Sequence, residues 1–158
     1  MRFGAFLSRV CQHEEYVKGL TKIRYERLNS RQQEIFNFQW ISGALATYGF
    51  HTHRVPDDWE GADFIARHMV TGKQIMVQLK SRIHFAKKYQ NKSIWIAFRH
   101  LDRAYLYPHD ALLEEYLKLN PMLSNQAWNG PDGAVHSREP TKAQLALLKD
   151  YEVGWKLD

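Results

Sequence analysis

Residues 61–82 read GADFIARHMVTGKQIMVQLKSR, and this stretch decides the fold that we expect. Two runs rich in apolar and β-branched residues, 62–69 and 73–82, lie on either side of Thr71-Gly72, a pair typical of a turn. The pattern predicts a β-hairpin. If the hairpin turns at Thr71-Gly72, Asp63 lies opposite Lys80 and Ile65 lies opposite Gln78.

Side chains alternate between the two faces of a strand, so this register places Asp63, Gln78 and Lys80 on one face. Val77 and Leu79 then point to the other face and into the core. A bulge, or a turn displaced by one residue, would change the relation of the two strands. The expected geometry therefore depends on the turn.

The three polar side chains suit the hydrolysis of a phosphodiester. Mg²⁺ prefers oxygen ligands, which the Asp63 carboxylate, the Gln78 amide and the backbone carbonyl of Leu79 can supply. The Lys80 ammonium can orient the attacking water or stabilise charge on the phosphate. The hairpin therefore predicts a divalent-metal site at Asp63, Gln78 and Leu79.

The elements around the hairpin indicate an α+β (α/β) fold. A helix is expected from Ser30 to the glycine stop at Gly49, with its buried face at Ile35, Phe38, Ile41, Leu45 and Tyr48. Strand-like runs follow at 50–55, 62–69, 73–82, 93–98 and 104–107. We expect a central mixed β-sheet of four or five strands, arranged largely as a meander and flanked by helices.

The C-terminal part is expected to hold helices and one loop. Asp110 is interpreted as the N-cap of a helix over 111–119, and 120–133 (NPMLSNQAWNGPDG) as a long loop. A last helix over 141–149 and an aromatic tail at 151–157 complete the chain. We expect one domain over 1–158, with a helical N-terminal arm (1–28), a core (30–107) and C-terminal helices with a loop (108–158).

The charge and the cysteine content limit the classes of function that the chain can have, but they do not select one. The net charge is +5 and the pI about 9.3, which favours polyanions such as nucleic acid. Cys11 is the single cysteine, so an internal disulfide and a cysteine-rich zinc cage are excluded. The apolar residues near the N-terminus are interrupted by Ser8 and Arg9, which is unlike a signal peptide or a membrane span. We expect a soluble, cytoplasmic protein.

Asp63, fourteen intervening residues, and then Gln78-Leu79-Lys80, all preceded by a helix, resemble the PD-(D/E)XK nuclease superfamily. The resemblance covers Ser30 to Tyr107, about half the chain. It implies a restriction-endonuclease-like core and Mg²⁺-dependent (or Mn²⁺-dependent) cleavage, most often of DNA. It also implies a supporting carboxylate on the first helix, for which Glu34 is the candidate.

Two features depart from that superfamily's usual pattern. Gln78 stands where an Asp or Glu is usual, as in the branches that carry Gln-x-Lys. Only His84 to Asn91 separates the third and fourth expected strands, so the usual helix there is short or missing.

Basic residues follow the hairpin closely: Arg82, Lys87, Lys88 and Lys92. They are candidates for binding DNA phosphates, and a solvated loop is the alternative interpretation. Cutting both strands of a duplex needs two active sites, so we expect a homodimer or larger homo-oligomer, with the N-terminal arm as the contact.

Other motifs give weaker indications of function. His51 and His53 share a strand face, but no further zinc ligand is near them in sequence. His109-Asp110 is interpreted as structural, and Trp128 can either stack on a base or anchor its loop. A P-loop, a GxSxG elbow and an HExxH pair are absent from the sequence.

Three functions are therefore open. The first is a Mg²⁺-dependent endodeoxyribonuclease. The second is a catalytically inactive nuclease-fold protein that binds nucleic acid or acts as a scaffold, with Gln78 marking the lost site. The third is an unrelated α+β interaction domain, which Asp63 on the opposite face from Lys80 would favour.

Overall fold

A computed structural model describes residues 19–154, without the side chains of residues 57–59. The predicted N-terminal arm therefore lies largely outside the described residues. Its described part, 19–28, holds only a 3₁₀ turn, η1 (Tyr25–Arg27), so the helical prediction is wrong for this part. Within 19–154, no helix is long and apolar enough to cross a membrane.

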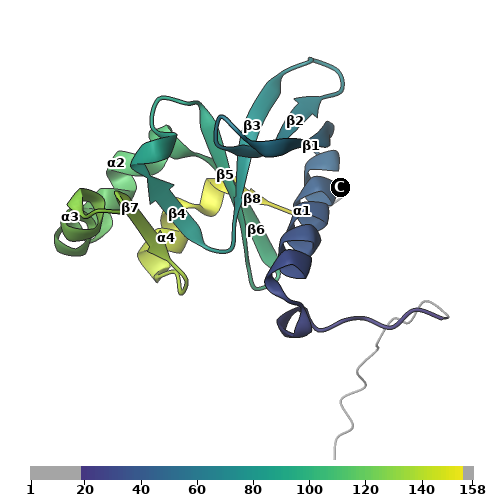
Figure 1. Ribbon diagram of the computed structural model, residues 1–158, viewed down its shortest axis with the longest axis horizontal. Coiled ribbons are helices and arrows are strands. Elements are labelled where there is room, and N and C mark those ends of the chain that lie inside the picture. The colour runs from purple at the N-terminus through teal and green to yellow at the C-terminus, as the bar shows by residue number, and fades with distance from the viewer. Residues whose placement is uncertain (1–18, 155–158) are drawn as a thin grey trace, which may run out of the picture.

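A six-stranded mixed sheet forms the centre of the molecule, with the order β1-β2-β3-β5-β6-β8 (Figure 1). The strands are β1 (Phe50–Trp59), β2 (Ala62–His68), β3 (Gln74–Lys80), β5 (Ile94–His100), β6 (Arg103–Pro108) and β8 (Glu152–Val153). This confirms the predicted α+β class with a mixed sheet flanked by helices. The sixth strand comes from the C-terminal tail, because Glu152 and Val153 pair with β6 and form the edge strand β8.

The meander prediction is wrong between β3 and β5, which run parallel and pair from Met76–Ile94 to Lys80–Phe98. Parallel neighbours need a crossover connection, because the chain must return to the starting edge. Here the crossover consists of β4 (Ile83–Ala86) and the 3₁₀ turn η2 (Lys87–Tyr89). β4 leaves the main sheet and pairs with β7 (Ala134–Ser137) instead.

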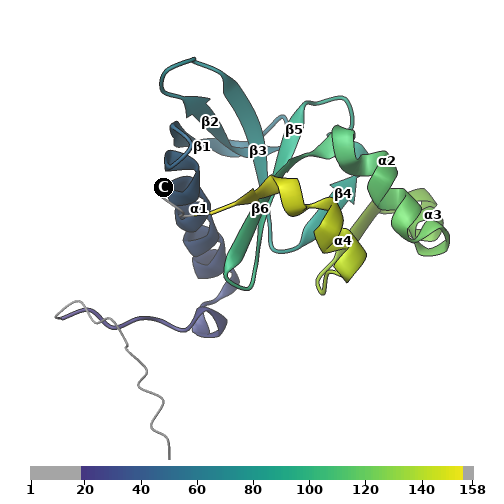
Figure 2. The same ribbon diagram turned by 180° about the vertical axis from the view of Figure 1, so that it is seen from behind.

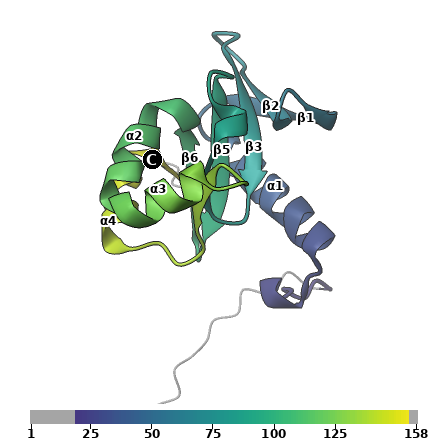
Figure 3. The same cartoon turned by 60° about the vertical axis from the view of Figure 1, so that its left-hand side comes forward.

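Helices cover both faces of the sheet. α1 (Ser30–Ala46) packs on one face, against a cluster that includes Phe64 and Val77. The helices α2 (His109–Leu119), α3 (Pro121–Asn129) and α4 (Lys142–Leu147) lie on the other side, as Figures 2 and 3 show. The larger cluster there includes Phe98, Tyr107 and Leu148.

The first helix begins at Ser30, as expected, but its N-cap lies one residue earlier. Asn29 is the N-cap: its side chain accepts from Gln32 N, and the Gln32 side chain accepts from Asn29 N, both at 2.9 Å. Its buried face comprises Asn37, Ile41, Ala44 and Leu45. Ile35 and Tyr48 were predicted to be buried but are 42% and 51% exposed, because they lie at the margins of this stripe.

The predicted loop at 120–133 is wrong for most of its length, because α3 occupies it. Pro121 takes the first helical position, where a missing N–H costs nothing, and the Asn120 side chain accepts from Leu123 N at 3.4 Å. Asp110 is likewise not an N-cap, since α2 begins at His109 after Pro108. The Asp110 carboxylate instead accepts from Asn91 N at 2.8 Å, which holds the turn before β5.

Arg99, near the end of β5, fastens the segment before α1 to the sheet. Its guanidinium carbon lies 5.2, 5.0 and 5.3 Å from the ring centroids of Tyr25, Phe36 and Trp40. It also donates to Asn37 Oδ1 at 3.2 Å and to the Leu101 carbonyl at 3.1 Å. Burial lowers the pKa of Arg99, and these contacts offset the cost of burying the charge.

We expect Arg99→Ala to lower the free energy of unfolding by about 2 kcal/mol, from lost cation–π contacts and charged hydrogen bonds. Urea denaturation followed by circular dichroism measures it. Arg67→Ala, at an exposed strand position, is the matched control and should change it little. Equal effects of the two substitutions would contradict the anchoring role of Arg99.

Candidate functional site

The β2–β3 hairpin pairs in a register two residues away from the predicted one. Ile65 lies opposite Met76, where Gln78 was expected, and the ladder runs from Phe64–Val77 to Arg67–Gln74. The reason is the turn: His68 N donates to the Lys73 carbonyl at 2.8 Å, so the loop spans 69–73.

Two more features hold this loop. The His68 Nδ1 atom accepts from Val70 N and Thr71 N, at 3.3 and 3.1 Å. Gly72, with φ +72°, therefore closes the turn and does not form its centre. An even displacement keeps each side chain on its face, so Asp63, Gln78 and Lys80 still share one. Asp63 on the opposite face from Lys80 would have favoured the interaction-domain hypothesis, and strand alternation does not place it there.

The two strands separate beyond the Phe64–Val77 pair, and the Asp63 carboxylate fills the opening. Asp63 Oδ2 accepts from the backbone N of Leu79 at 2.7 Å and from Gln78 Nε2 at 2.5 Å. Gln78 Nε2 also lies 3.4 Å from the Leu79 carbonyl oxygen, to which it donates. We call these three residues the Asp63 junction. The structure therefore brings together the three predicted metal-ligating residues.

A cleft of about 390 Å³ opens beside the junction and is lined by ten residues: Tyr25, Ser30, Gln33, Glu34, Asn37, Leu79, Lys80, Ser81, Arg82 and Arg138. We call it the basic cleft. Leu79 belongs to both the cleft and the junction, whereas Asp63 and Gln78 do not line the cleft. Glu34 is thus brought to the same cleft as Lys80, but its carboxylate is paired with Arg54 at 3.1 Å.

Arg138 was missed by sequence reasoning. It follows β7, and it reaches the cleft only because β7 pairs with β4, with Ser137 opposite Ile83. A single arginine far along the chain carries no local signal of this position. The cleft therefore has three cationic side chains, those of Lys80, Arg82 and Arg138.

The predicted phosphate-binding lysines lie in and after the crossover. Lys88 Nζ is 4.9 Å from the Tyr89 ring centroid, and Lys80 Nζ is 5.5 Å from the same centroid. Lys87 Nζ lies 5.7 Å from the Trp128 ring, which packs partly on the core. Lys92 is exposed in the turn before β5. The Lys88 cation thus shares the Tyr89 ring with Lys80, Lys87 lies over Trp128, and Arg82 is in the cleft itself.

Two histidines face each other on the small sheet. His84 and His136 are opposite residues of β4 and β7, and their rings stack with centroids 6.2 Å apart. Burial, and then the charge of Lys80, lower the pKa of His84 to about 4, with smaller effects of His136, Lys88 and His109. His84 is therefore uncharged at neutral pH.

The remaining histidine motifs have structural roles or lie at the surface. His109 Nε2 accepts from Ala86 N at 3.0 Å, so its Nδ1 carries the proton and donates to Asp110 at 2.7 Å. Burial lowers the pKa of His109, in keeping with this neutral form. The His51 and His53 rings are exposed and 4.8 Å apart. Within 19–154, no three His, Cys, Asp or Glu side chains gather as a metal site.

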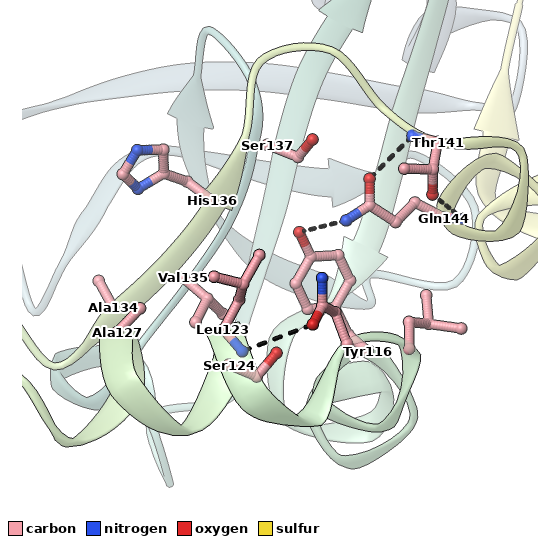
Figure 4. Close-up of a pocket in the computed structure, with 12 residues that line it drawn as sticks. Tyr116, Leu123, Ser124, Ala127, Ala134, Val135, His136, Ser137, Thr141 and Gln144 are labelled. Atoms are coloured by element: carbon pink, nitrogen blue, oxygen red, sulfur yellow. Dashed lines mark hydrogen bonds between the residues drawn. The ribbon is translucent and has the colours of Figure 1, made fainter.

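A second cavity, of about 310 Å³, lies among α2, α3, α4 and β7 (Figure 4). Tyr116, Asn120, Thr141 and Gln144 each make a hydrogen bond within its lining. Gln144 donates to the Tyr116 hydroxyl at 3.0 Å and caps α4 through Thr141, while Asn120 caps α3. Burial raises the pKa of Tyr116 to about 12, so its hydroxyl stays protonated. Two of these bonds cap α3 and α4, and the junction residues are not among the lining.

The comparisons with known proteins identify no family for this chain. No protein-family model matches the sequence, and no curated protein matches it. Among solved structures, a bacterial homing endonuclease aligns over 72% of this chain and 78% of its own, with 14% sequence identity and a TM-score of 0.39.

The lowered pKa of His84 predicts how stability depends on pH. A folded-state pKa of about 4 against an ordinary value of 6.5 means that the folded state binds fewer protons than the unfolded state in this window. The free energy of unfolding should therefore be highest above pH 6.5 and fall as the pH drops toward 4. His84→Asn should make this fall shallower, as measured by urea denaturation across the window.

Exposed His53→Asn is the control, and its profile should match that of the wild type. The backbone of His84 bonds to the Tyr107 hydroxyl at 3.0 Å in both directions, so the side-chain substitution leaves this tie intact. Parallel pH profiles for His84→Asn and the wild type would contradict the prediction.

Proposed function

We propose that this protein is a metal-dependent endonuclease that hydrolyses DNA phosphodiester bonds, using Mg²⁺ or Mn²⁺. One observation supports this above the others. The oxygens of Asp63 and Leu79 converge on one polar atom at the open end of a β-ladder, and Lys80 follows directly on the same strand. A carboxylate, a carbonyl and an amide beside an ammonium form a donor set suited to phosphoryl chemistry.

The residues present fit a hard divalent cation. Gln78 Nε2, which carries partial positive charge, donates to both the Asp63 carboxylate and the Leu79 carbonyl. These two oxygens therefore already converge on one positive group. Turning the Gln78 amide by 180° would present its oxygen to the same point. Mg²⁺ commonly accepts one or two carboxylates and keeps several waters, so a site with one carboxylate fits it.

Asp63, Gln78 and Leu79 would hold the cation, which would act as a Lewis acid on the scissile phosphate. Lys80, with its ammonium beside the basic cleft, orients the attacking water and stabilises the charge that builds on the phosphate. Arg82 and Arg138 bind phosphate oxygens in the cleft. Glu34 is a supporting residue, since its ion pair with Arg54 must open before its carboxylate can act.

Nucleic acid is the substrate class that the charges favour. The chain carries a net charge of +5, Lys88 shares the Tyr89 ring with Lys80, and Lys87 and Lys92 are further exposed cations. Those lysines would hold the DNA backbone while the cleft receives the phosphate to be cut. A homodimer would supply the second site needed for cutting both strands, and this assembly belongs to the same proposal.

A second function is favoured by one feature of the junction. The Gln78 amide bonds to both oxygens and thereby supplies the positive partner that a cation would supply in an active site. A nuclease-fold scaffold that binds DNA without cutting it would keep the same contacts. Metal binding and cleavage separate the two functions.

Asp63→Asn keeps an acceptor for Leu79 N but removes the charge, and Lys80→Ala removes the ammonium. We expect each to reduce cleavage of supercoiled plasmid and of a four-way junction by about 100-fold or more, with Mg²⁺ or Mn²⁺ present. Lys73→Ala, in the exposed turn at the far end of the hairpin, is the control and should cut normally.

Two outcomes would count against this proposal. Cleavage that persists in both Asp63→Asn and Lys80→Ala would place the active site elsewhere. DNA binding by the wild type without any cutting would favour the scaffold.

Gln78→Glu tests the metal site without relying on activity. Without a cation, the new carboxylate takes the place of a donor 2.5 Å from Asp63 Oδ2, so repulsion should lower the melting temperature. Added Mg²⁺ should restore it, with an apparent affinity roughly tenfold higher than that of the wild type. Thermal unfolding over a Mg²⁺ titration measures both effects.

Exposed Gln74→Glu, on the same strand, is the control for an added charge. A Mg²⁺ response of Gln78→Glu no greater than that of Gln74→Glu would argue against a cation at the junction.

A further inference from the structure

Tyr89 occupies the centre of the crossover that joins β3 to β5. It is 1% exposed, although both of its neighbours, Lys88 and Gln90, are exposed. The Lys80 ammonium lies 5.5 Å from its ring centroid and the Lys88 ammonium 4.9 Å from it. The ring therefore packs against Lys80, the residue proposed to orient the attacking water and to stabilise charge on the phosphate.

The same ring also supports the approach to Asp63. Gly61 has φ +89°, and a Cβ built there would lie 3.3 Å from the Tyr89 Cδ1 and Cε1 atoms. The turn that leads into β2 thus rests against the ring edge, two residues before Asp63. Because Tyr89 touches this turn and the Lys80 ammonium, it connects the two strands just where their ladder has ended.

Two histidine rings of the core also hold Tyr89 in place. The His109 ring meets it edge-to-face at 5.7 Å, and the His84 ring lies 6.1 Å away. His109 is itself fixed by Ala86 N and by Asp110. The ring that faces Lys80 therefore cannot turn away without disturbing a buried network.

We propose that Tyr89 is the residue that positions Lys80, and this inference rests on the function proposed for Lys80. A lysine has four rotatable side-chain bonds, and the attraction of its ammonium to the face of a ring reduces the range of its positions. Tyr89 acts through Lys80 and does not touch the phosphate. Its aromatic ring is the required feature, and its hydroxyl is not.

Lys80 geometry can be measured without any substrate. The ε-methylene protons of Lys80 should resonate upfield of those of exposed lysines in the nuclear magnetic resonance spectrum, because they lie over an aromatic ring. The shift should persist in Tyr89→Phe and disappear in Tyr89→Met, in which a flexible apolar side chain fills much of the space. Lys80→Ala assigns the signal.

Cleavage kinetics then test whether the position of Lys80 over the ring affects the chemical step. Tyr89→Met should reduce kcat for plasmid cleavage roughly 10- to 100-fold with KM changed less than about twofold, since misplacement of a catalytic group affects the chemical step. Tyr89→Phe should retain the wild-type kcat. Phe85→Leu, a buried aromatic in the same core cluster, is the control for lost packing and should leave kcat unchanged in the folded fraction.

The outcomes are distinguishable from a failure of the proposed function. A wild type that shows the upfield shift but no cleavage would refute the nuclease proposal, and with it any role of Tyr89 in catalysis. A wild type that cleaves DNA without the shift would refute the positioning by Tyr89 alone. Loss of kcat in Tyr89→Phe, or an equal loss in Phe85→Leu, would show that Tyr89 acts through its hydroxyl or through general packing.

Discussion

The hydrogen bond from the Leu79 backbone to Asp63 is the contact on which the rest of the site depends. It lies where β2 and β3 stop pairing, so a carboxylate takes the place that a backbone carbonyl would hold in a continued ladder. Because the strands then diverge, the Leu79 carbonyl and the Gln78 side chain reach the same point. In a longer ladder, the backbone groups at this point would bond to the neighbouring strand instead.

The parallel pairing of β3 with β5 also shapes the site. It forces a crossover immediately after Lys80, and that crossover supplies the surroundings of the site. β4 recruits β7 and with it Arg138, while η2 buries Tyr89 beneath the cations of Lys80 and Lys88. The short connection thus takes the place of a crossover helix and contributes side chains directly.

Cations outnumber anions in this region. Lys80, Arg82 and Arg138 line one cleft, and Lys88 is close enough to contribute to the lowered pKa of His84. Like charges held together in this way destabilise a free surface, and a bound polyanion relieves that repulsion. The junction shares Leu79 with this cleft, so the cation proposed for the junction and phosphates in the cleft would lie close together.

The sequence by itself determined the class of fold, the hairpin and the placement of Asp63, Gln78 and Lys80 on one face, because strand alternation is local and survives an even change of register. It also indicated the first helix through its capping residues and apolar spacing. It did not determine the register, which the hydrogen bonds of the His68 side chain set by placing the turn at 69–73. Nor could it place Arg138 beside Lys80, Tyr89 beneath it, or the helix after Pro121. Those positions follow from pairings and packing between distant segments, for which a local pattern holds no signal.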